Sequence, residues 1–488
     1  MSYNQIQIGW SEVSITPSRP ISIEGQLYYR ISQYVHDPIY ATALALDNGI
    51  EQSIMVSIDI VGVLPAYIEK IQSAVNGVDG INAQKITFSA THTHNSSQFS
   101  MNSIAERFRK YIGEDLVLTI EKPEDFLSPE EAEAFFLEKI INVILTAWRN
   151  RKPGGISYAS DYAVVGFNRR PVFGSGESKV ESKMYGDCSQ DNFLRFEGTV
   201  DHTIDMIYTW DMDRNLTGVL VDVPSPSQVY ELHNFISADY WAPARDRIRS
   251  GLGNIHVLSI CGAAGDQNPL DLVRISKTNS RELIEWNAQV GEVFRNINME
   301  AECDDIGERI ADAVTRGFRK AKNHIQTEPV FLHKTFIMEL PIRKVSEEDY
   351  REALLTIEET KKKFSAKNRM TSADQVSLFE PIGIVQRWEQ QQKTENFSFR
   401  ANILRIGSVA IATNPFELFV EYGLRIRARC KAEQVCIFQL TNGIGGYLPT
   451  EAAIAGGSYS SKPASTLVGP KSGDALVERV IKEINELW

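Results

Sequence analysis

Short apolar runs alternate with longer amphipathic runs along the whole chain. Short runs rich in β-branched residues and bounded by turn residues predict strands, whereas apolar positions that recur every three to four residues predict helices. The clearest helix covers 128–150, because Ser128 can cap it, Pro129 suits its first position and acidic residues fill the first turn. The other predicted strands are "TALALDNG", "QSIMVSIDIVGV", "KITFSA", 204–210, 216–222, 255–261, 330–340, 401–413 and 435–441. The other predicted helices are 65–76, 237–249, 303–321, 346–364, 416–431 and 474–486.

Strands and helices that are mixed from one end to the other predict an α/β (α+β) protein with mixed β-sheets flanked by helices. No internal repeat or low-complexity linker divides the sequence, so we expect residues 1–488 to form a single large domain. The stretches 171–192, 269–282 and 366–384 predict long loops or lids. Loops of that length in a compact domain tend to be functional.

Composition and charge narrow the class of partner. An apolar content of 43% supports a large core, and a net charge of -12 argues against a nucleic-acid partner, which needs clustered cationic surface. The N-terminus shows no secretion signal, and no run approaches the roughly 18 apolar residues of a membrane span. Five scattered cysteines without a CxxC pair favour a reducing cytoplasm. We therefore expect a small-molecule substrate and no membrane partner; a homo-oligomer remains open.

The segment "THTHNSS" places His92 and His94 two positions apart at the end of a predicted strand. Residues i and i+2 of a strand share a face, so we expect both imidazoles to point the same way. They could share a metal ion, or one could bind the metal while the other meets the substrate. The alternative is that backbone or water satisfies both rings in an ordinary loop.

Three further segments carry candidate chemistry. "CGAAGDQNP" leads a strand into a glycine-containing turn with Asp266 and Asn268, where exposed amides can hold an anion or oxyanion; a plain turn is equally compatible. Glu417 lies near a predicted helix start and is either a helix-dipole carboxylate or a metal ligand. "TNGIGGYLPTEAAIAGGSYS" can present Tyr447 and Tyr459 to a site. Neither a GxSxG nucleophile elbow nor an HExxH zinc motif occurs.

Taken in order, these segments resemble the catalytic domain of the neutral (non-lysosomal) ceramidase family. Its Gly…Asp-Ile-Thr-Pro strand corresponds to "IGWSEVSITP", its VSADLG motif to "VSIDIVG" and its Thr-His-Thr-His-Ser-Gly motif to "THTHNSS". Its Asn-Arg-Ser motif corresponds to Asn168-Arg169-Arg170, and its Gly-Asp-Val-Ser-Pro-Asn motif to "GDQNPL". Its Pro-Gly-Glu and Gly-Tyr-x-Thr motifs correspond to Pro415-Phe416-Glu417 and "GGYLPT". The order is kept over almost the whole chain.

The resemblance implies a zinc site with His92, Glu417 and Tyr447 as ligands. It also implies that His94, Arg169 and Tyr459 line the catalytic site, and Tyr459 keeps the family's spacing of twelve residues after the ligand tyrosine. The family's second zinc histidine has no counterpart at its place, so His233, Glu231 or His94 would rebuild the fourth position, unless the metal preference is altered or the metal site is lost. The family's nucleophilic serine falls on Asn268.

From these features we expect a metal-dependent hydrolase, with zinc or another divalent ion as cofactor. Metal-activated water would cleave an amide or ester bond of a soluble, non-lipid intracellular substrate held by Asp266, Asn268 and Gln228. Ceramide itself is not the expected substrate, because the sequence shows no lipid-binding apolar segment and no counterpart of the family's C-terminal immunoglobulin-like domain. Two alternatives stay open: a carbohydrate-active lyase or hydrolase on a sugar derivative, which would place the chain in carbohydrate metabolism, and a non-catalytic ligand-binding protein.

Overall fold

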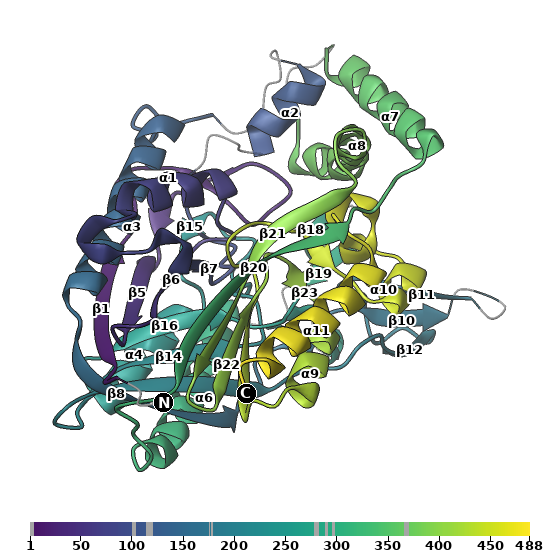
Figure 1. Cartoon of the computed structure of the whole chain (residues 1–488). Coiled ribbons are helices and arrows are strands. Elements are labelled where there is room, and N and C mark those ends of the chain that lie inside the picture. The colour runs from purple at the N-terminus through teal and green to yellow at the C-terminus, as the bar shows by residue number, and fades with distance from the viewer. Residues whose placement is uncertain are drawn as a thin grey trace.

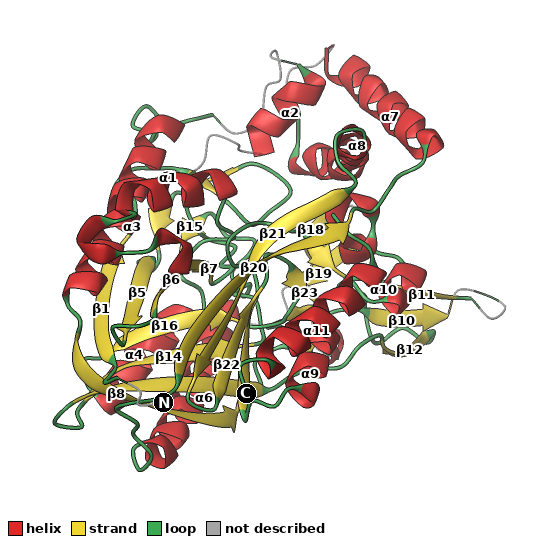
Figure 2. Ribbon diagram, in the orientation of Figure 1, coloured by secondary structure: helices red, strands yellow, loops and turns green. Residues whose placement is uncertain are grey.

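Two β-sheets packed face to face form the centre of the protein (Figures 1 and 2). The computed structural model describes residues 4–99, 104–113, 121–174, 176, 179–277, 283–287, 291–294, 298–365 and 370–488. The eight-stranded sheet has the order β16 (His256–Cys261), β14 (Leu216–Val223), β13 (Thr203–Asp211), β8 (Lys152–Tyr162), β1 (Gln7–Ser14), β5 (Tyr40–Asp47), β6 (Gln52–Ile58) and β7 (Ile86–Ala90). The four-stranded sheet has the order β20 (Phe331–Pro341), β21 (Asn396–Ile406), β22 (Val409–Thr413) and β24 (Gln434–Phe438).

Apolar side chains between the two sheets form one core, to which Trp10 and Leu258 contribute from the larger sheet and Leu404 and Phe438 from the smaller one. The other face of the eight-stranded sheet is covered by α1 (Pro65–Val75), α3 (Pro129–Arg149), α4 (Trp241–Leu252) and α6 (Met299–Ala321). The outer face of the four-stranded sheet is covered by α9 (Val420–Arg429) and α11 (Pro470–Asn485). The predicted fold class, mixed sheets flanked by helices, is therefore confirmed.

Smaller elements surround these layers. The short strands are β2 (Ser22–Ile23), β3 (Arg30–Ile31), β4 (Tyr34–Val35), β9 (Phe167–Asn168), β10 (Pro171–Gly174), β11 (Val180–Ser182), β12 (Phe193–Phe196), β15 (Phe235–Ile236), β17 (Gln267–Asn268), β18 (Leu283–Asn287), β19 (Gly291–Phe294), β23 (Glu417–Leu418) and β25 (Tyr447–Leu448). The remaining helices are α2 (Ile104–Ile112), α5 (Leu272–Ser276), α7 (Glu347–Ser365), α8 (Ser372–Gln391) and α10 (Glu451–Gly456). Within the described ranges, no helix has the length and apolarity needed to cross a membrane.

The structure corrects several element predictions. The prediction of a loop over 366–384 is wrong for the residues that the structure describes, because α8 begins there at Ser372. A capping box formed by Thr371 and Asp374 starts this helix, and Pro381 lies in its interior. The predicted strand 401–413 is two antiparallel strands, β21 and β22, which turn at Gly407 with a φ of 60°. The stretch 171–192 contains β10 and β11. In 269–282 the chain forms α5, and 278–282 lie outside the described residues.

The carboxyl ends of the parallel strand pairs meet between the two sheets. β6 runs parallel to β7, β14 to β16, and β22 to β24. Ligands of α/β proteins bind at the carboxyl ends of such strands. The candidate segments follow these ends: "THTH" follows β7, Gln228 follows β14, Asp266 follows β16, and Glu417 and Tyr447 follow β22 and β24.

Candidate active site

His92 is held with one ring nitrogen committed to the backbone. The backbone of His92 is left-handed, with a φ of 63°, and its backbone N–H donates to Ile60 O at 3.0 Å. The ring nitrogen Nδ1 lies 2.7 Å from Val61 O. A carbonyl oxygen only accepts, so Nδ1 carries a ring proton and Nε2 is the nitrogen that can bind a metal ion. That backbone partner is the arrangement typical of metal-ligating histidines.

The Nε2 of His92 faces a carboxylate. It lies 3.3 Å from Glu417 Oε2. Burial acts to raise the pKa of Glu417, but the charge and hydrogen bond of His92 outweigh it, and the net pKa lies below its ordinary value. Glu417 lies in β23, just before the start of α9, and β23 pairs with β25 so that Glu417 stands opposite Tyr447.

His94 has the opposite tautomer. Gln228 donates from Nε2 to Nδ1 of His94 at 3.0 Å. The amide orientation of Gln228 follows from its other contacts, since Arg169 Nη1 donates to Oε1 at 3.4 Å and Nε2 donates to Glu231 at 3.2 Å. Nδ1 of His94 therefore accepts and its proton is on Nε2, 3.4 Å from His92 Nε2.

His94 is thus a donor at Nε2, on the side that faces His92. Burial, followed by the charges of His92, Arg30 and Arg169, holds the pKa of His94 well below its ordinary value, so the ring is neutral at physiological pH. The two rings meet edge to face at 86°. The expectation that both point the same way from a strand is wrong, since β7 ends at Ala90 and His92 is left-handed.

Arg169 is buried and joins the two sides of the site. Its Nη2 donates to Tyr447 Oη and to Gly265 O, both at 2.9 Å. Burial lowers the pKa of Arg169, but Tyr447, Tyr185 and Glu417 outweigh this effect, and the net pKa lies above its ordinary value. The Tyr459 ring packs edge-on against Tyr447 at 5.5 Å. Both phenols have raised pKa values, chiefly through burial.

Asp266 and Asn268 are buried and engaged by the protein itself. Asp266 accepts from Val420 N at the start of α9 and from Asn168 Nδ2, each at 2.9 Å. Asn268 accepts from Leu270 N at 2.9 Å and donates to Tyr185 Oη at 2.6 Å. These contacts position α9 and Tyr185; substrate contact by Asp266 or Asn268 stays a prediction.

Of the three residues proposed for the missing ligand position, His94 and Glu231 lie together and His233 lies apart from them. Glu231 lies beside His94, with Oε2 3.6 Å from Nδ1, and burial raises its pKa. The exposed His233 instead stacks its ring on Phe235 at 5.0 Å and meets Tyr230 edge-on. The His233 ring thus packs on an aromatic cluster, whereas His94 adjoins His92 and Glu231 adjoins His94.

Three site residues carry no sequence signal. Tyr185, from the predicted loop 171–192, interacts with Asn268 and Arg169. Arg30 donates to the carbonyls of His94, Glu24, Glu231 and His233. Gly25 has a φ of 108°, and a Cβ there would lie 2.5 Å from Cα of His94, so glycine is required for this close approach.

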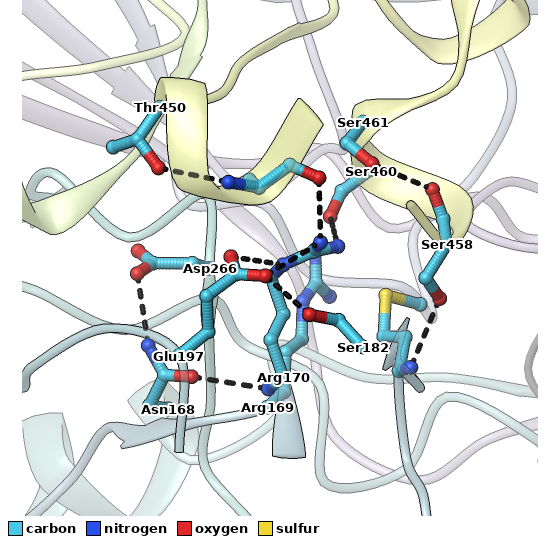
Figure 3. A network of polar contacts seen from close by, with 12 residues as sticks. Asn168, Arg169, Arg170, Ser182, Glu197, Asp266, Thr450, Ser458, Ser460 and Ser461 are labelled. Atoms are coloured by element: carbon cyan, nitrogen blue, oxygen red, sulfur yellow. Dashed lines mark hydrogen bonds and ion pairs between the residues drawn. The ribbon is translucent and has the colours of Figure 1, made fainter. Parts of the chain in front are cut away.

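Arg170, where the family motif has serine, anchors the segment that carries Tyr459 (Figure 3). Its Nε and Nη2 donate to the two oxygens of Glu197 at 2.7 and 3.1 Å, and both side chains are buried. It also donates to Ser460 Oγ at 3.0 Å and to Gly457 O at 2.6 Å. This network holds the 3₁₀ turn Tyr459–Ser461 against the site.

The donor set around His92 fits a zinc ion. Tetrahedral zinc ligands with bonds of about 2.0–2.1 Å lie roughly 3.3–3.4 Å apart. The 3.3 Å between His92 Nε2 and Glu417 Oε2 matches this separation and exceeds an ordinary N–H···O hydrogen bond. Elsewhere among the described residues, Asp205, Asp222 and Cys436 also place ligand atoms within 4.8 Å of one another. In that group, Arg427 Nη2 lies 3.0 Å from Asp205 Oδ2, so the guanidinium group already compensates the carboxylate charge.

We predict that Glu24, next to Gly25, makes stability depend on pH. Burial raises the pKa of Glu24 to about 7, against the opposing charge of Arg107. Between pH 5 and 7 the folded state holds a proton that the unfolded state releases, so the free energy of unfolding falls by about 1 kcal/mol per pH unit as pH rises. Urea unfolding of wild type and Glu24→Gln at pH 5, 6 and 7 checks this. The difference between the two should shrink to nothing as pH falls towards 5; equal slopes would contradict the prediction.

The two-sheet α/β architecture is that of the neutral ceramidase fold. The chain is similar to the crystal structure of neutral ceramidase from Pseudomonas aeruginosa, with 17% identity and a TM-score of 0.66 over 99% of this chain and 74% of that one. It is also similar to a structure of ceramidase complexed with C2, with 16% identity and a TM-score of 0.66 over 99% and 75% of the two chains. No protein-family model and no curated sequence matches. The resemblance seen in the motifs is therefore confirmed for the fold.

Proposed function

We propose that the protein is a metal-dependent hydrolase that cleaves an amide or ester bond of a non-lipid small molecule. The observation that carries the proposal is the approach of His92 Nε2 to Glu417 Oε2 at 3.3 Å. Nδ1 of His92 is committed to Val61 O, so only a proton or a metal ion at Nε2 allows this nitrogen and the carboxylate oxygen to lie so close. The ceramidase-type fold supports the same class of reaction.

His92, Glu417 and Tyr447 would hold the ion, leaving a fourth position open, as in catalytic zinc sites. When bound, zinc supplies a water molecule of lowered pKa and polarises a carbonyl oxygen. Arg169 donates to Tyr447 Oη and so favours the phenolate that a ligand tyrosine requires. Because Asn268 replaces the family serine, the proposal needs no acyl-enzyme.

The other site residues bind and orient the reacting groups. His94 directs its Nε2–H towards His92 Nε2; with a metal ion on His92 this donor would be free for a developing oxyanion, and one such donor contributes about 3 kcal/mol. Gln228 fixes the His94 tautomer, and Glu231 holds Gln228 in turn. Tyr459 adds a second phenol beside Tyr447.

Metal removal tests the proposal. The purified protein should contain about one zinc ion per chain, and a chelator should abolish turnover of amide and ester reporters, which added zinc restores. Metal analysis and initial rates check this. Cys436→Ser is the matched control, because it alters the other ligand group and should leave metal content unchanged. Turnover that persists in the metal-free protein would overturn the proposal.

A further inference from the structure

Tyr185 lies in the turn 183–186, and this turn is tied directly to the 3₁₀ turn of Tyr459. Met184 N donates to Ser458 Oγ at 3.0 Å. Met184 immediately precedes Tyr185, and Ser458 immediately precedes Tyr459. This one hydrogen bond therefore fixes the backbones of the two tyrosines relative to each other.

The buried ion pair of Arg170 and Glu197 joins the same two turns (Figure 3). Glu197 Oε2 accepts a hydrogen bond from Ser182 Oγ, one residue before the turn 183–186. Arg170 Nη1 donates to Ser460 Oγ at 3.0 Å, one residue after Tyr459. One bidentate pair, away from solvent, thus contacts both turns through side-chain hydroxyls.

Both turns contain a backbone conformation that residues with a Cβ rarely adopt. Tyr185 has a φ of 61° and Ser458 a φ of 76°. Tyr185 N donates to Arg169 O at 3.2 Å, and Lys183 N donates to Pro171 O at 2.9 Å. Such strain persists only where the surroundings fix it, and it is concentrated at functional sites.

The Tyr185 hydroxyl lies on the His94 side of the site. Asn268 Oδ1 accepts from Leu270 N, so Asn268 Nδ2 is the donor to Tyr185 Oη at 2.6 Å. The proton of Tyr185 therefore remains available for another acceptor. Burial raises the pKa of Glu231, and a hydrogen bond from Tyr185 acts against this. Glu231 Oε2 in turn lies 3.6 Å from His94 Nδ1.

The side chains of the ion pair are buried, whereas Tyr185 and Tyr459 are partly exposed. We propose that Tyr185 and Tyr459 both hydrogen-bond the substrate, and that Arg170 and Glu197 form a positioning pair that holds the two phenols. This deepens the proposed function and rests on it for the reaction. The positioning pair acts through the tyrosines and does not itself touch the substrate.

Amide hydrogen exchange, followed by mass spectrometry, tests the coupling of the two turns without any reaction. In Arg170→Lys the ammonium group cannot reach Glu197 and Ser460 together, because lysine lacks the fork of donors. Amides in both 183–186 and 457–462 should therefore exchange at least tenfold faster than in wild type.

Arg429→Lys is the matched control for exchange. Arg429 forms a bidentate pair with Glu478 at 2.5 and 2.8 Å, but this pair is exposed to solvent. The control should change exchange in neither turn. Ser460→Ala keeps the buried ion pair and removes one of its contacts, so it should speed exchange in 457–462. It replaces Arg170→Lys if circular dichroism shows that variant to be unfolded.

Reporter kinetics test the two phenols. Tyr185→Phe should lower kcat/KM at least tenfold with zinc content unchanged. Tyr158→Phe is the matched control, because the Tyr158 hydroxyl donates to Glu433 at 2.8 Å instead, and it should change kcat/KM less than twofold. Arg170→Lys should lower kcat/KM tenfold in wild type but less than twofold when Tyr185 and Tyr459 are both phenylalanine.

Unchanged exchange in either turn of folded Arg170→Lys overturns the proposal, as does unchanged exchange in Ser460→Ala. Wild-type kcat/KM in Tyr185→Phe, or equal losses from Arg170→Lys in the two backgrounds, also overturns it. Failure of the proposed hydrolase appears differently, as absent zinc or zinc-independent turnover in wild type, and does not alter the exchange result.

Discussion

Replacement of Glu417 by glutamine is expected to remove bound zinc and to lower kcat/KM by about a thousandfold or more, because a neutral amide is a poor ligand for zinc. The same change should leave the metal-free protein as stable as wild type, or more stable. The glutamine amide can still form a hydrogen bond with His92 Nε2, which lies 3.3 Å from Glu417 Oε2 in wild type. Loss of metal with retained stability is the signature of a ligand rather than of a structural carboxylate.

Metal analysis, reporter kinetics and urea unfolding of the chelated proteins measure these effects. Glu421→Gln is the matched control, since Glu421 lies four residues further along the chain and is exposed in α9. His92→Ala should also lose the metal. Wild-type zinc content in both Glu417→Gln and His92→Ala would contradict the assignment.

Replacement of Asp59 by alanine is expected to cost about 3–5 kcal/mol of unfolding free energy, because it leaves Arg245 buried without a counter-charge. The two side chains are buried and form a bidentate pair, with distances of 2.6 and 2.8 Å. Asp59 also accepts from Tyr40 N at 2.8 Å. Because Ile60 and Val61 supply the carbonyls that hold His92, the variant should weaken zinc binding as well.

The matched control for this buried pair is the exposed pair of Arg247 and Asp304. Asp304→Ala should cost less than about 1 kcal/mol, since solvent screens an exposed ion pair. Urea unfolding at constant pH compares the two variants. Similar decreases in unfolding free energy in the two variants would contradict the prediction that the buried Asp59–Arg245 pair matters more than an exposed pair.

Much of the fold was predictable because its sheets and helices follow local patterns. Apolar runs located the central strands, and Ser128 and Pro129 marked the start of α3. α8 was missed because Pro381 and Gly383 read as loop residues, whereas packing of Gly383 on Ala464 favours a helix there. Tertiary contact overrides weak local propensity in such segments.

The sequence by itself determined the ceramidase-type fold and the identity of His92, His94, Arg169, Glu417, Tyr447 and Tyr459 as a group, because their order along the chain carries that information. Only the tertiary structure decided their chemical states. The Val61 carbonyl fixes a proton on Nδ1 of His92, and Gln228 puts the proton of His94 on Nε2. It also brought Gly25, Arg30 and Tyr185 to the site, since contacts between residues far apart in sequence leave no periodic pattern in either segment.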